Sequence, residues 1–335
     1  MSAMTLPRAV EAEQKLAEAY APIAGELAEA ERIYARELGS RFPFVQRLVE
    51  HAADFRGKRL RPALVLLTAQ ACGGIRPAHP VLAAVVEMVH TATLVHDDIL
   101  DDSMVRRHAA TVNAGWGNES AVLLGDYLFS HAFHLAATLE TTLACRWIGE
   151  ATTLVCEGEM MQVHNRGNFD LSESAYFEIV GGKTAELTAV SCRLGAHYAG
   201  ASDATVKAIG GYGRDLGIAF QVADDVLDLW GDERTVGKTL GTDLEKQKLT
   251  LPVIRLLATA EPELAARLRA MLDHPSAAVR REVRPYLETS GALDHAWDRA
   301  KQYARRAQAA LNILPETRAR EVLRMLAQYV VRRPY

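Results

Sequence analysis

Apolar residues recur at intervals of three and four positions along most of the chain. This spacing places them on one face of a helix, because an α-helix turns once every 3.6 residues. Two clear examples are the series Leu16, Tyr20, Ile23 and Leu27 and the series Leu82, Val85, Val86, Val89 and Thr93. Alternating runs, which predict strands, are scarce. The pattern predicts an all-α protein with roughly ten or more helices around one core.

Glycine pairs and clusters between the periodic segments predict where helices end. Examples are Gly73-Gly74, Gly181-Gly182 and the Gly210 to Gly213 stretch. No low-complexity linker divides the 335 residues, although length alone would suggest two domains. We expect a single domain over 1–335, with the chemical motifs at about 57–254 around one central cavity.

The charge balance is close to neutral, since 38 Lys plus Arg against 42 Asp plus Glu give a net charge of −4. No overall field therefore attracts nucleic acid. The four cysteines form no CxxC pair, so neither a disulfide framework nor a cysteine metal site is expected. The start of the chain lacks the apolar segment of a signal peptide, and no uninterrupted run reaches about 18 apolar residues. We expect a cytoplasmic protein without a membrane span.

Four aspartates stand together in the segment LVHDDILDDS. Helical spacing places Asp97 and Asp101 one turn apart on the same face, with Asp98 and Asp102 beside them. Like charges repel, raise carboxyl pKa values and destabilise the helix, so a bound cation is the natural compensation. For one such cluster alone, a solvated face or a salt-bridge patch is an equally good interpretation.

A second cluster, Asp224, Asp225 and Asp228, repeats this spacing in the segment FQVADDVLDLW. Its apolar neighbours make unpaired carboxylates costly, and two such clusters favour metal binding over a solvated face. Hard oxygen ligands suit Mg²⁺, which keeps some waters and shares its other positions with phosphate oxygens. Two facing carboxylate helices could therefore hold a diphosphate through bridging Mg²⁺ ions.

Cationic side chains that could complete an anion site lie outside both clusters. They are Lys58, Arg59 and Arg61, the pair Arg106-Arg107, Lys183, Lys238 and Lys248. Arginine grips phosphate through two N–H groups, and lysine acts as a point charge. Each one alone is unremarkable, because Lys and Arg are common on surfaces. Their grouping around the acidic clusters suits an enzyme that binds two diphosphates and ionises one of them.

Together these motifs make the chain resemble the trans-isoprenyl diphosphate synthase family, and within it the long-chain polyprenyl synthases of the octaprenyl type. The matching segments are GKRLRPAL at 57–64, HTATLVHDDILDDSMVRR at 90–107, GDYLFS at 125–130, GEMMQ at 158–162, GKTAEL at 182–187, GIAFQVADDVLD at 217–228 and GKTLGTDLEKQKLTLPVI at 237–254. The resemblance implies a helical isoprenoid-synthase bundle with a central active-site cavity. It also implies a homodimeric, Mg²⁺-dependent prenyltransferase that joins isopentenyl diphosphate head-to-tail to an allylic diphosphate, such as geranyl or farnesyl diphosphate.

The resemblance also implies residue roles at the matching positions. Asp97, Asp98 and Asp101 with Asp224 would coordinate Mg²⁺ on the allylic diphosphate, and Asp225 and Asp228 would support the second side. About three ions per site are implied when diphosphate is bound. Arg106, Lys183 and Lys238 would hold that diphosphate, with Thr184 and Lys248 as further substrate contacts. Gly57, Lys58, Arg61, His90 and Arg107 would bind isopentenyl diphosphate, and Gln162, Phe220 and Gln221 would line the space between the substrates. The catalytic residues would be Asp97, Asp98, Asp101, Lys183, Asp224 and Lys238.

Product length is expected to depend on the helix that leads away from Asp97. Val89, Ala92 and Thr93 fall on one side of it, beneath the point where the diphosphate would lie. In short-chain members of the family a bulky aromatic near the position of Ala92 closes the pocket. The small Ala92 thus implies a product of about seven to ten isoprene units, or about C35–C50. The alternative is that Ala92 only permits close helix packing.

Two positions depart from the family pattern. The family usually has glycine after the paired arginines and before the last lysine of 243–248, where this chain has His108 and Gln247. Neither change removes a metal ligand or a motif lysine, so activity remains the expectation.

Five other interpretations fit parts of the sequence less well. A shorter-chain synthase would use the same motifs. A class I terpene cyclase normally carries a different second metal motif, and a head-to-head condensing enzyme lacks the GKRLRP segment. The Glu87-x-x-His90 spacing matches one element of di-iron four-helix proteins, although a second such element is absent. A non-catalytic subunit of a heteromeric synthase usually loses aspartates that this chain keeps.

Overall fold

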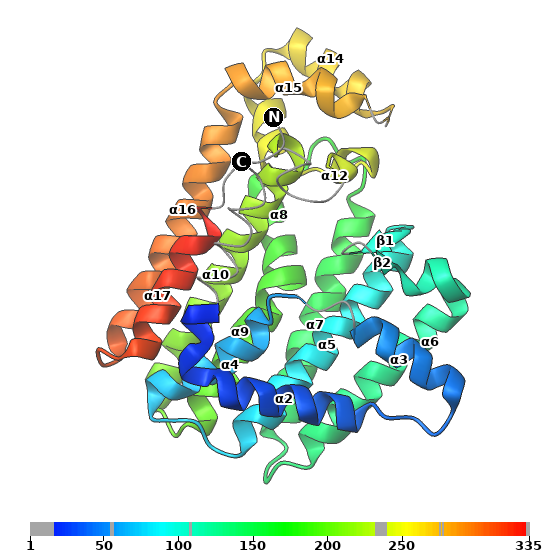
Figure 1. The fold of residues 1–335 in the computed structure, drawn as a ribbon. Helices are drawn as coiled ribbons and strands as arrows, with labels where there is room; N and C mark the ends of the chain where they lie inside the picture. Colours follow the sequence, from blue (N-terminus) through cyan, green and yellow to red (C-terminus); the bar gives the residue numbers. More distant parts are fainter. Residues whose placement is uncertain are drawn as a thin grey trace, which may run out of the picture.

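The computed structural model describes residues 17–53, 57–106, 109–231, 240–274, 276 and 278–332, and helices dominate it (Figure 1). The helices are η1 (Ala21–Ile23), α2 (Ala24–Glu37), α3 (Pro43–Ala53), α4 (Leu60–Cys72), α5 (Ala78–Leu100), α6 (Val112–Ala137), α7 (Leu143–His164), α8 (Glu173–Val180), η2 (Gly181–Ala185), α9 (Glu186–Tyr198), α10 (Asp203–Trp230), α12 (Thr242–Glu245), α13 (Leu251–Thr259), α14 (Pro262–Leu272), α15 (Val279–Thr289), α16 (Ala292–Ala310), η3 (Leu311–Ile313) and α17 (Arg318–Val330). One short antiparallel ribbon pairs β1 (Val105–Arg106) with β2 (Ala109–Ala110). The prediction of an all-α fold is confirmed.

Hydroxyl side chains mark where several helices begin. Thr111, Ser172 and Ser202 precede α6, α8 and α10, and each accepts a hydrogen bond from a backbone N–H in the first turn. These caps satisfy donors that the helix cannot pair internally. At the other end of a helix, Gly73 follows α4 with φ 141°, a conformation that glycine adopts without steric cost.

The glycines at 210 to 213 do not end a helix, contrary to the sequence prediction, whereas Gly181 does follow the last residue of α8. Gly210 and Gly213 lie within α10, and Gly181-Gly182 lie in the π-helical turn η2 between α8 and α9. Close packing explains why glycine occupies these positions. A Cβ atom on Gly217 of α10, for example, would stand 2.6 Å from the Cα of Ala185. These glycines let α10 approach η2 and α9 closely.

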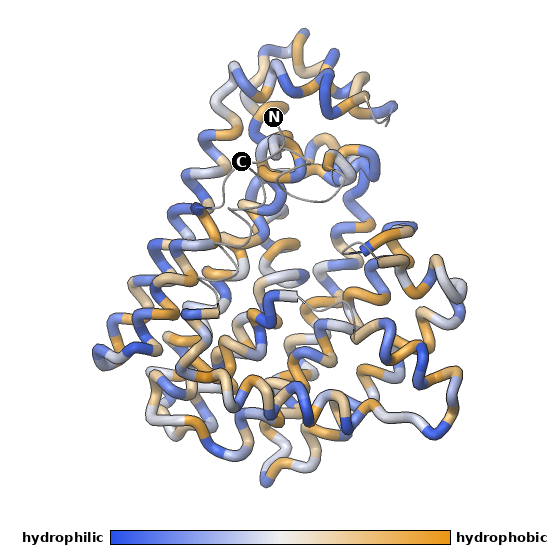
Figure 2. The backbone as a smooth tube through the Cα atoms, in the orientation of Figure 1, coloured by the Kyte–Doolittle hydropathy of each residue, from blue (hydrophilic) through white to orange (hydrophobic). Residues whose placement is uncertain are grey.

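Two clusters of buried apolar side chains hold the helices together, and α10 contributes to both. Its first half, through Val206, Ile209 and Leu216, joins the cluster that includes residues of α2, α4, α5 and α6. Its second half, through Val222 and Val226, joins the cluster of α8 and α13 to α16. Along outer helices such as α16 the colour alternates between hydrophilic and hydrophobic (Figure 2). This is expected for helices that pack on one face only. The single domain remains a prediction.

Helix α5 is strongly apolar although it contains no long uninterrupted run of apolar residues. By length and hydropathy it is the one helix among the described residues that could cross a membrane, but 72 % of its apolar window is buried within the protein. It packs against α2, α4 and α6, and a helix surrounded on several sides is apolar around its whole circumference. Burial in the core thus accounts for its composition.

All four cysteines, Cys72, Cys145, Cys156 and Cys192, are free thiols, which confirms that no disulfide framework supports this fold.

Candidate active site

The first aspartate cluster lies at the C-terminal end of α5. Asp97 and Asp98 stand in its last turn, and Asp101 is the residue at which the helix ends, with its N–H donating to the carbonyl of Asp97 at 2.9 Å. The C-terminus of a helix carries partial negative charge. Three carboxylates at this end therefore need cations, and the fold supplies several from distant segments.

Asp98 is 1 % exposed and is gripped by Arg106, which follows it on the short ribbon. The Arg106 Nε lies 2.9 Å from both carboxylate oxygens, and its Nη2 lies 2.8 Å from Oδ1. Burial raises the pKa of Asp98, and the guanidinium opposes that rise. Asp98, which is predicted to bind metal, and Arg106, which is predicted to bind diphosphate, thus form an ion pair in this structure.

Asp101 and Asp97 meet cations from other parts of the chain. Asp101 Oδ1 lies 3.2 Å from Arg166 Nη2 and 3.4 Å from Lys246 Nζ. Burial raises the pKa of Asp97 to about 6, while Lys183 opposes that rise and the like charges of Glu159 and Asp101 add to it. An Asp97 carboxylate that stays ionised at neutral pH therefore gains from any further cation beside it.

Lys183 is held in place by a close contact between two helices. It lies in the π-helical turn η2, an arrangement found frequently at functional sites. A Cβ atom on Gly158 of α7 would stand 2.3 Å from the Lys183 backbone nitrogen, so only glycine permits this approach. The ammonium group forms an ion pair with Glu159, the residue that follows Gly158.

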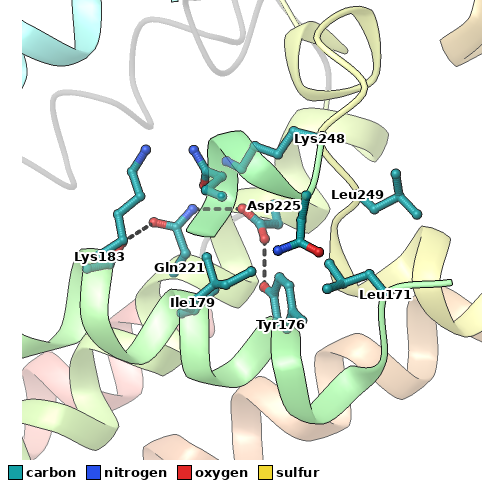
Figure 3. A pocket seen from close by; sticks show the side chains of 12 residues that line it. Leu171, Tyr176, Ile179, Lys183, Gln221, Asp225, Lys248 and Leu249 are labelled. Atoms are coloured by element: carbon teal, nitrogen blue, oxygen red, sulfur yellow. Dashed lines mark hydrogen bonds between the residues drawn. The ribbon is translucent and has the colours of Figure 1, made fainter. Parts of the chain in front are cut away.

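The second aspartate cluster lies in the last turns of α10. Asp225 is buried, and its two carboxylate oxygens accept hydrogen bonds from Tyr176 Oη at 2.6 Å and Gln221 Nε2 at 2.7 Å (Figure 3). Burial raises the Asp225 pKa to about 6, and the nearby Lys248 opposes this. Thr184 donates to Gln221 Oε1 at 2.9 Å, which links this network to the residue after Lys183.

Asp228 is buried and Asp224 is half-buried. The Asp228 carboxylate accepts from Thr242 Oγ1 at 3.4 Å and from the backbone nitrogen of Asp243 at 3.3 Å. These bonds fix the start of α12 against α10.

Lys248 lies at the junction of the two clusters. Its Nζ donates to Asp243 Oδ1 at 3.1 Å. Burial alone would lower the Lys248 pKa, but the carboxylates of Asp243 and Asp225 outweigh burial, Asp101 adds to them, and the pKa stands above its ordinary value. Lys248 is therefore a fixed cation that interacts electrostatically with Asp225 of one cluster and Asp101 of the other.

A pocket opens between α7, α8, η2, the last part of α10 and the segment around Lys248 (Figure 3). Its lining residues are Gln162, Asn165, Leu171, Tyr176, Ile179, Val180, Lys183, Thr184, Gln221, Asp225, Lys248 and Leu249. The lining combines apolar side chains with the two lysines and Asp225. An anion with an attached apolar chain fits such a lining.

The GKRLRP segment forms a second group of cations at the start of α4. Arg61 Nη1 and His90 Nε2 lie 3.0 Å apart, so two of the residues predicted to share a substrate do meet. Lys58 Nζ instead donates to Tyr329 Oη on α17 at 3.3 Å. Half-buried Gly57 begins the described part of this segment.

The di-iron interpretation of Glu87 and His90 finds no support. Glu87 pairs with Arg59 at 2.5 Å, and His90 lies beside Arg61. No group of three or more histidine, cysteine, aspartate or glutamate side chains that could hold a metal occurs among the residues that the structure describes.

For Mg²⁺, this means that the aspartates of the described ranges do not by themselves form a complete set of metal ligands. The donor chemistry nevertheless fits. Asp97 interacts electrostatically with Lys183, Asp225 and Asp101 interact with Lys248, and burial raises the pKa values of Asp97 and Asp225. An ion that takes part of its coordination from a ligand's oxygens and waters suits this arrangement.

The remaining predicted residues take different positions. Ala92 and Val89 have no exposed surface, Thr93 is half-buried, and none of the three lines the pocket. Phe220 packs at the edge of the first apolar cluster. Arg107, His108 and Lys238 lie outside the described residues.

Sequence reasoning missed several residues of the site, namely Tyr176, Glu159, Asp243, Arg166 and Lys246. Glu159, Asp243 and Lys246 stand inside quoted motifs, at 158–162 and 237–254, and position in a motif was the signal that could have found them. Tyr176 and Arg166 lie outside every motif, so only the folded chain brings them to the clusters.

Comparison with known proteins places residues 42–288 in the match to the family model described as polyprenyl synthetase. The chain is 36 % identical over 300 residues to octaprenyl diphosphate synthase of Escherichia coli (strain K12), covering 89 % of this chain and 92 % of that protein. The crystal structure of a decaprenyl diphosphate synthase from Rhodobacter capsulatus matches with a TM-score of 0.88 and 34 % identity, over 95 % of this chain and 98 % of that one. A polyprenyl synthase from Caulobacter crescentus CB15, complexed with calcium and isoprenyl diphosphate, matches with a TM-score of 0.89 and 36 % identity, over the same shares of 95 % and 98 %.

Proposed function

This chain belongs to the polyprenyl synthetase family and is a prenyltransferase, and we propose that it extends an allylic diphosphate by repeated head-to-tail addition of isopentenyl diphosphate. The product is a long-chain trans-polyprenyl diphosphate of about C35–C50, and the depth of the path open to the growing chain sets its length. The observation that carries this proposal is that Asp97 of the first cluster and Asp225 of the second interact electrostatically with the fixed cations Lys183 and Lys248, respectively. A cytoplasmic location is part of the same proposal.

The allylic diphosphate would lie between the ends of α5 and α10. Asp97, Asp98 and Asp101 on one side and Asp224, Asp225 and Asp228 on the other would hold Mg²⁺ there. When bound, Mg²⁺ supplies Lewis-acid stabilisation of the charge that develops on the departing diphosphate. The binding of divalent metal together with isoprenyl diphosphate in the Caulobacter enzyme supports this arrangement.

The protein's own cations act on the same leaving group. Lys183 and Lys248 are held by Glu159 and Asp243, so they are oriented before the substrate arrives. Preoriented charge stabilises a developing anion without reorganisation during the reaction. The C–O bond of the allylic diphosphate breaks, and the carbocation is attacked by the C=C bond of isopentenyl diphosphate.

The new cation then loses a proton, which the released diphosphate accepts, so the mechanism requires no dedicated protein base. Water must be kept away, because it would trap the carbocation as an alcohol. The apolar side chains of the lining, such as Ile179, Val180 and Leu249, serve this purpose. Isopentenyl diphosphate would bind at the second cationic group, where Arg61 and His90 meet.

Calorimetric titration with an unreactive thio analogue of farnesyl diphosphate tests this assignment directly. We expect Mg²⁺ to tighten binding by about tenfold or more, equivalent to about 1.4 kcal/mol. Asp224→Ala should remove most of this gain, whereas Asp298→Ala on α16 serves as a control for loss of an exposed carboxylate. Equal affinity with Mg²⁺ and with a chelator would rule out metal-assisted binding.

We propose that the enzyme is a homodimer with twofold symmetry, the commonest arrangement for soluble oligomers. Exposed apolar side chains are concentrated on two helices: Val122 and Leu123 on α6, and Leu154, Met160, Met161 and Val163 on α7. Such side chains gather where a partner covers them.

Leu123 is 67 % exposed, so a charge at this position costs the monomer little but would be buried in the dimer. We expect wild-type protein to sediment as a dimer and Leu123→Glu as a monomer. Ile313→Glu, on η3 and also exposed, is the matched control and should stay dimeric. A fully active wild-type monomer at micromolar concentration would contradict the proposal.

A further inference from the structure

Gln247 adopts a backbone conformation that non-glycine residues rarely take. Its φ is 52°, in the left-handed region, and it lies between Lys246 and Lys248. This conformation persists only where surrounding contacts impose it. The contacts around Gln247 come from two segments that are distant in the sequence.

The first contact is made by the side chain. Gln247 Nε2 donates to the carbonyl oxygens of Leu272 and Asp273, at 3.4 and 3.3 Å. Helix α14 ends at Leu272, so these carbonyls belong to a helix end, where intrahelical partners run out. The carboxamide of Gln247 thus caps the C-terminus of α14.

The second contact is made by the backbone. The carbonyl of Gln247 accepts a hydrogen bond from the N–H of Gly167 at 2.9 Å. Gly167 lies in the loop 165–171 between α7 and α8, which lines the pocket through Asn165 and Leu171. In the same loop Arg166 reaches Asp101, and Asp170 pairs with Arg269 of α14 at 2.7 Å.

We infer that Gln247 is a positioning residue that links α14 to the loop 165–171 through its side chain and its backbone carbonyl, and so fixes the two lysines beside it. We call this pair of contacts the clasp. This inference rests on the proposed function. Lys246 Nζ lies 3.4 Å from Asp101 Oδ1, and Lys248 Nζ lies 3.1 Å from Asp243 Oδ1. A fixed backbone at 247 holds both ammonium groups beside the two aspartate clusters before a diphosphate binds.

The energetic consequence is a lower cost of binding the allylic diphosphate. Ordering a flexible lysine on binding reduces affinity, and a lysine that is already ordered avoids that loss. The second cationic group, around Arg61 and His90, belongs to α4 and α5 and lies outside the clasp. Loss of the clasp should therefore affect one substrate and spare the other.

Two substitutions separate the side-chain contact from the backbone conformation. Gln247→Met keeps the length of the side chain and the cost of the left-handed backbone but removes the N–H donors. Gln247→Gly removes the whole side chain and relieves the backbone strain. Arg267→Ala is the matched control, because Arg267 lies on α14 and bonds Tyr286 of α15 at 3.3 Å, away from the clasp.

Steady-state kinetics should show a split between the substrates. We expect both Gln247 variants to raise the KM for the allylic diphosphate about five- to twentyfold, with kcat and the KM for isopentenyl diphosphate within about twofold of wild type. Arg267→Ala should leave all three constants unchanged. Hydrogen exchange of the ligand-free protein should be faster in 165–171 and 246–248 in both Gln247 variants.

Three kinetic results would overturn the inference: wild-type constants in Gln247→Met, an equal rise of both KM values, or the same rise in Arg267→Ala. Failure of the proposed function is distinguishable from these. If the wild-type chain condenses no substrate, the function is wrong, while exchange in Gln247→Met still reports whether the clasp exists. Unchanged exchange in that variant would mean that no clasp is present.

Discussion

Asp97→Asn and Asp224→Asn are each expected to lower turnover by about three orders of magnitude or more, because the site loses a ligand for the metal that stabilises the leaving diphosphate. Each tenfold loss in rate corresponds to about 1.4 kcal/mol of transition-state stabilisation. The fold should survive. Burial raises the pKa of Asp97 to about 6, and the like charges of Glu159 and Asp101 add to this rise. We therefore expect the Asp97 charge to contribute to catalysis and not to the stability of the fold.

Asp102→Asn provides the matched control for this experiment. Asp102 is exposed, stands in the same acidic segment and has a φ of 45°, a conformation that asparagine tolerates. The control loses the same charge but should keep turnover within about twofold. Rates are measured at saturating Mg²⁺ and both substrates, alongside the melting temperature. Near-normal turnover in folded Asp97→Asn would refute the metal assignment at the end of α5.

Ala92→Phe is expected to shorten the product while the first condensation continues. Ala92 is fully buried in α5, five residues before Asp97. A close-packed interior does not absorb an aromatic ring without displacing something, and on our proposal the displaced volume is the path of the growing chain. The ring would lie roughly one or two turns, at about 5.4 Å each, below the metal ligands. Products are sized by reversed-phase chromatography after dephosphorylation.

A second phenylalanine on the same helix separates pocket filling from general overpacking. Ala83 is equally buried and lies nine residues earlier, which places it on the opposite side of α5 at about 100° per residue. Ala83→Phe should cost stability by about 1–3 kcal/mol, as overpacking does, yet leave product length unchanged. If Ala92→Phe is folded and active but forms the parental products, the tunnel runs along another face of this helix.

The helical fold was predictable because its signals are local. The apolar spacing around Val85 and Val89 describes a helix that the structure confirms, and the GKRLRP segment does lie at the start of a helix, since α4 begins at Leu60. The glycines at 210 and 213 were misread as breaks, because a glycine that ends a helix and one that permits close packing look alike in sequence. Only the neighbour across the interface distinguishes them.

The site was predictable in its residue types but not in its contacts. The spacing of the aspartates identified both clusters, yet the pairing of Arg106 with both carboxylate oxygens of Asp98 depends on the turn at 101–104 between α5 and β1. The bond from Tyr176 to Asp225 joins residues 49 positions apart, and no periodic pattern encodes such a pair. The roles of the aspartates and lysines stay predictions that the mutants above address.

Measuring the chain length of the products that the purified protein makes shows whether it is a long-chain synthase. It is incubated with labelled isopentenyl diphosphate and Mg²⁺, with geranyl, farnesyl or geranylgeranyl diphosphate as primer in turn, and the products are resolved by length. We expect a series of trans-polyprenyl diphosphates that ends at about C35–C50, with no product when the metal is chelated. Products that stop at about C15–C20, or cyclic hydrocarbons formed without consumption of isopentenyl diphosphate, would contradict it.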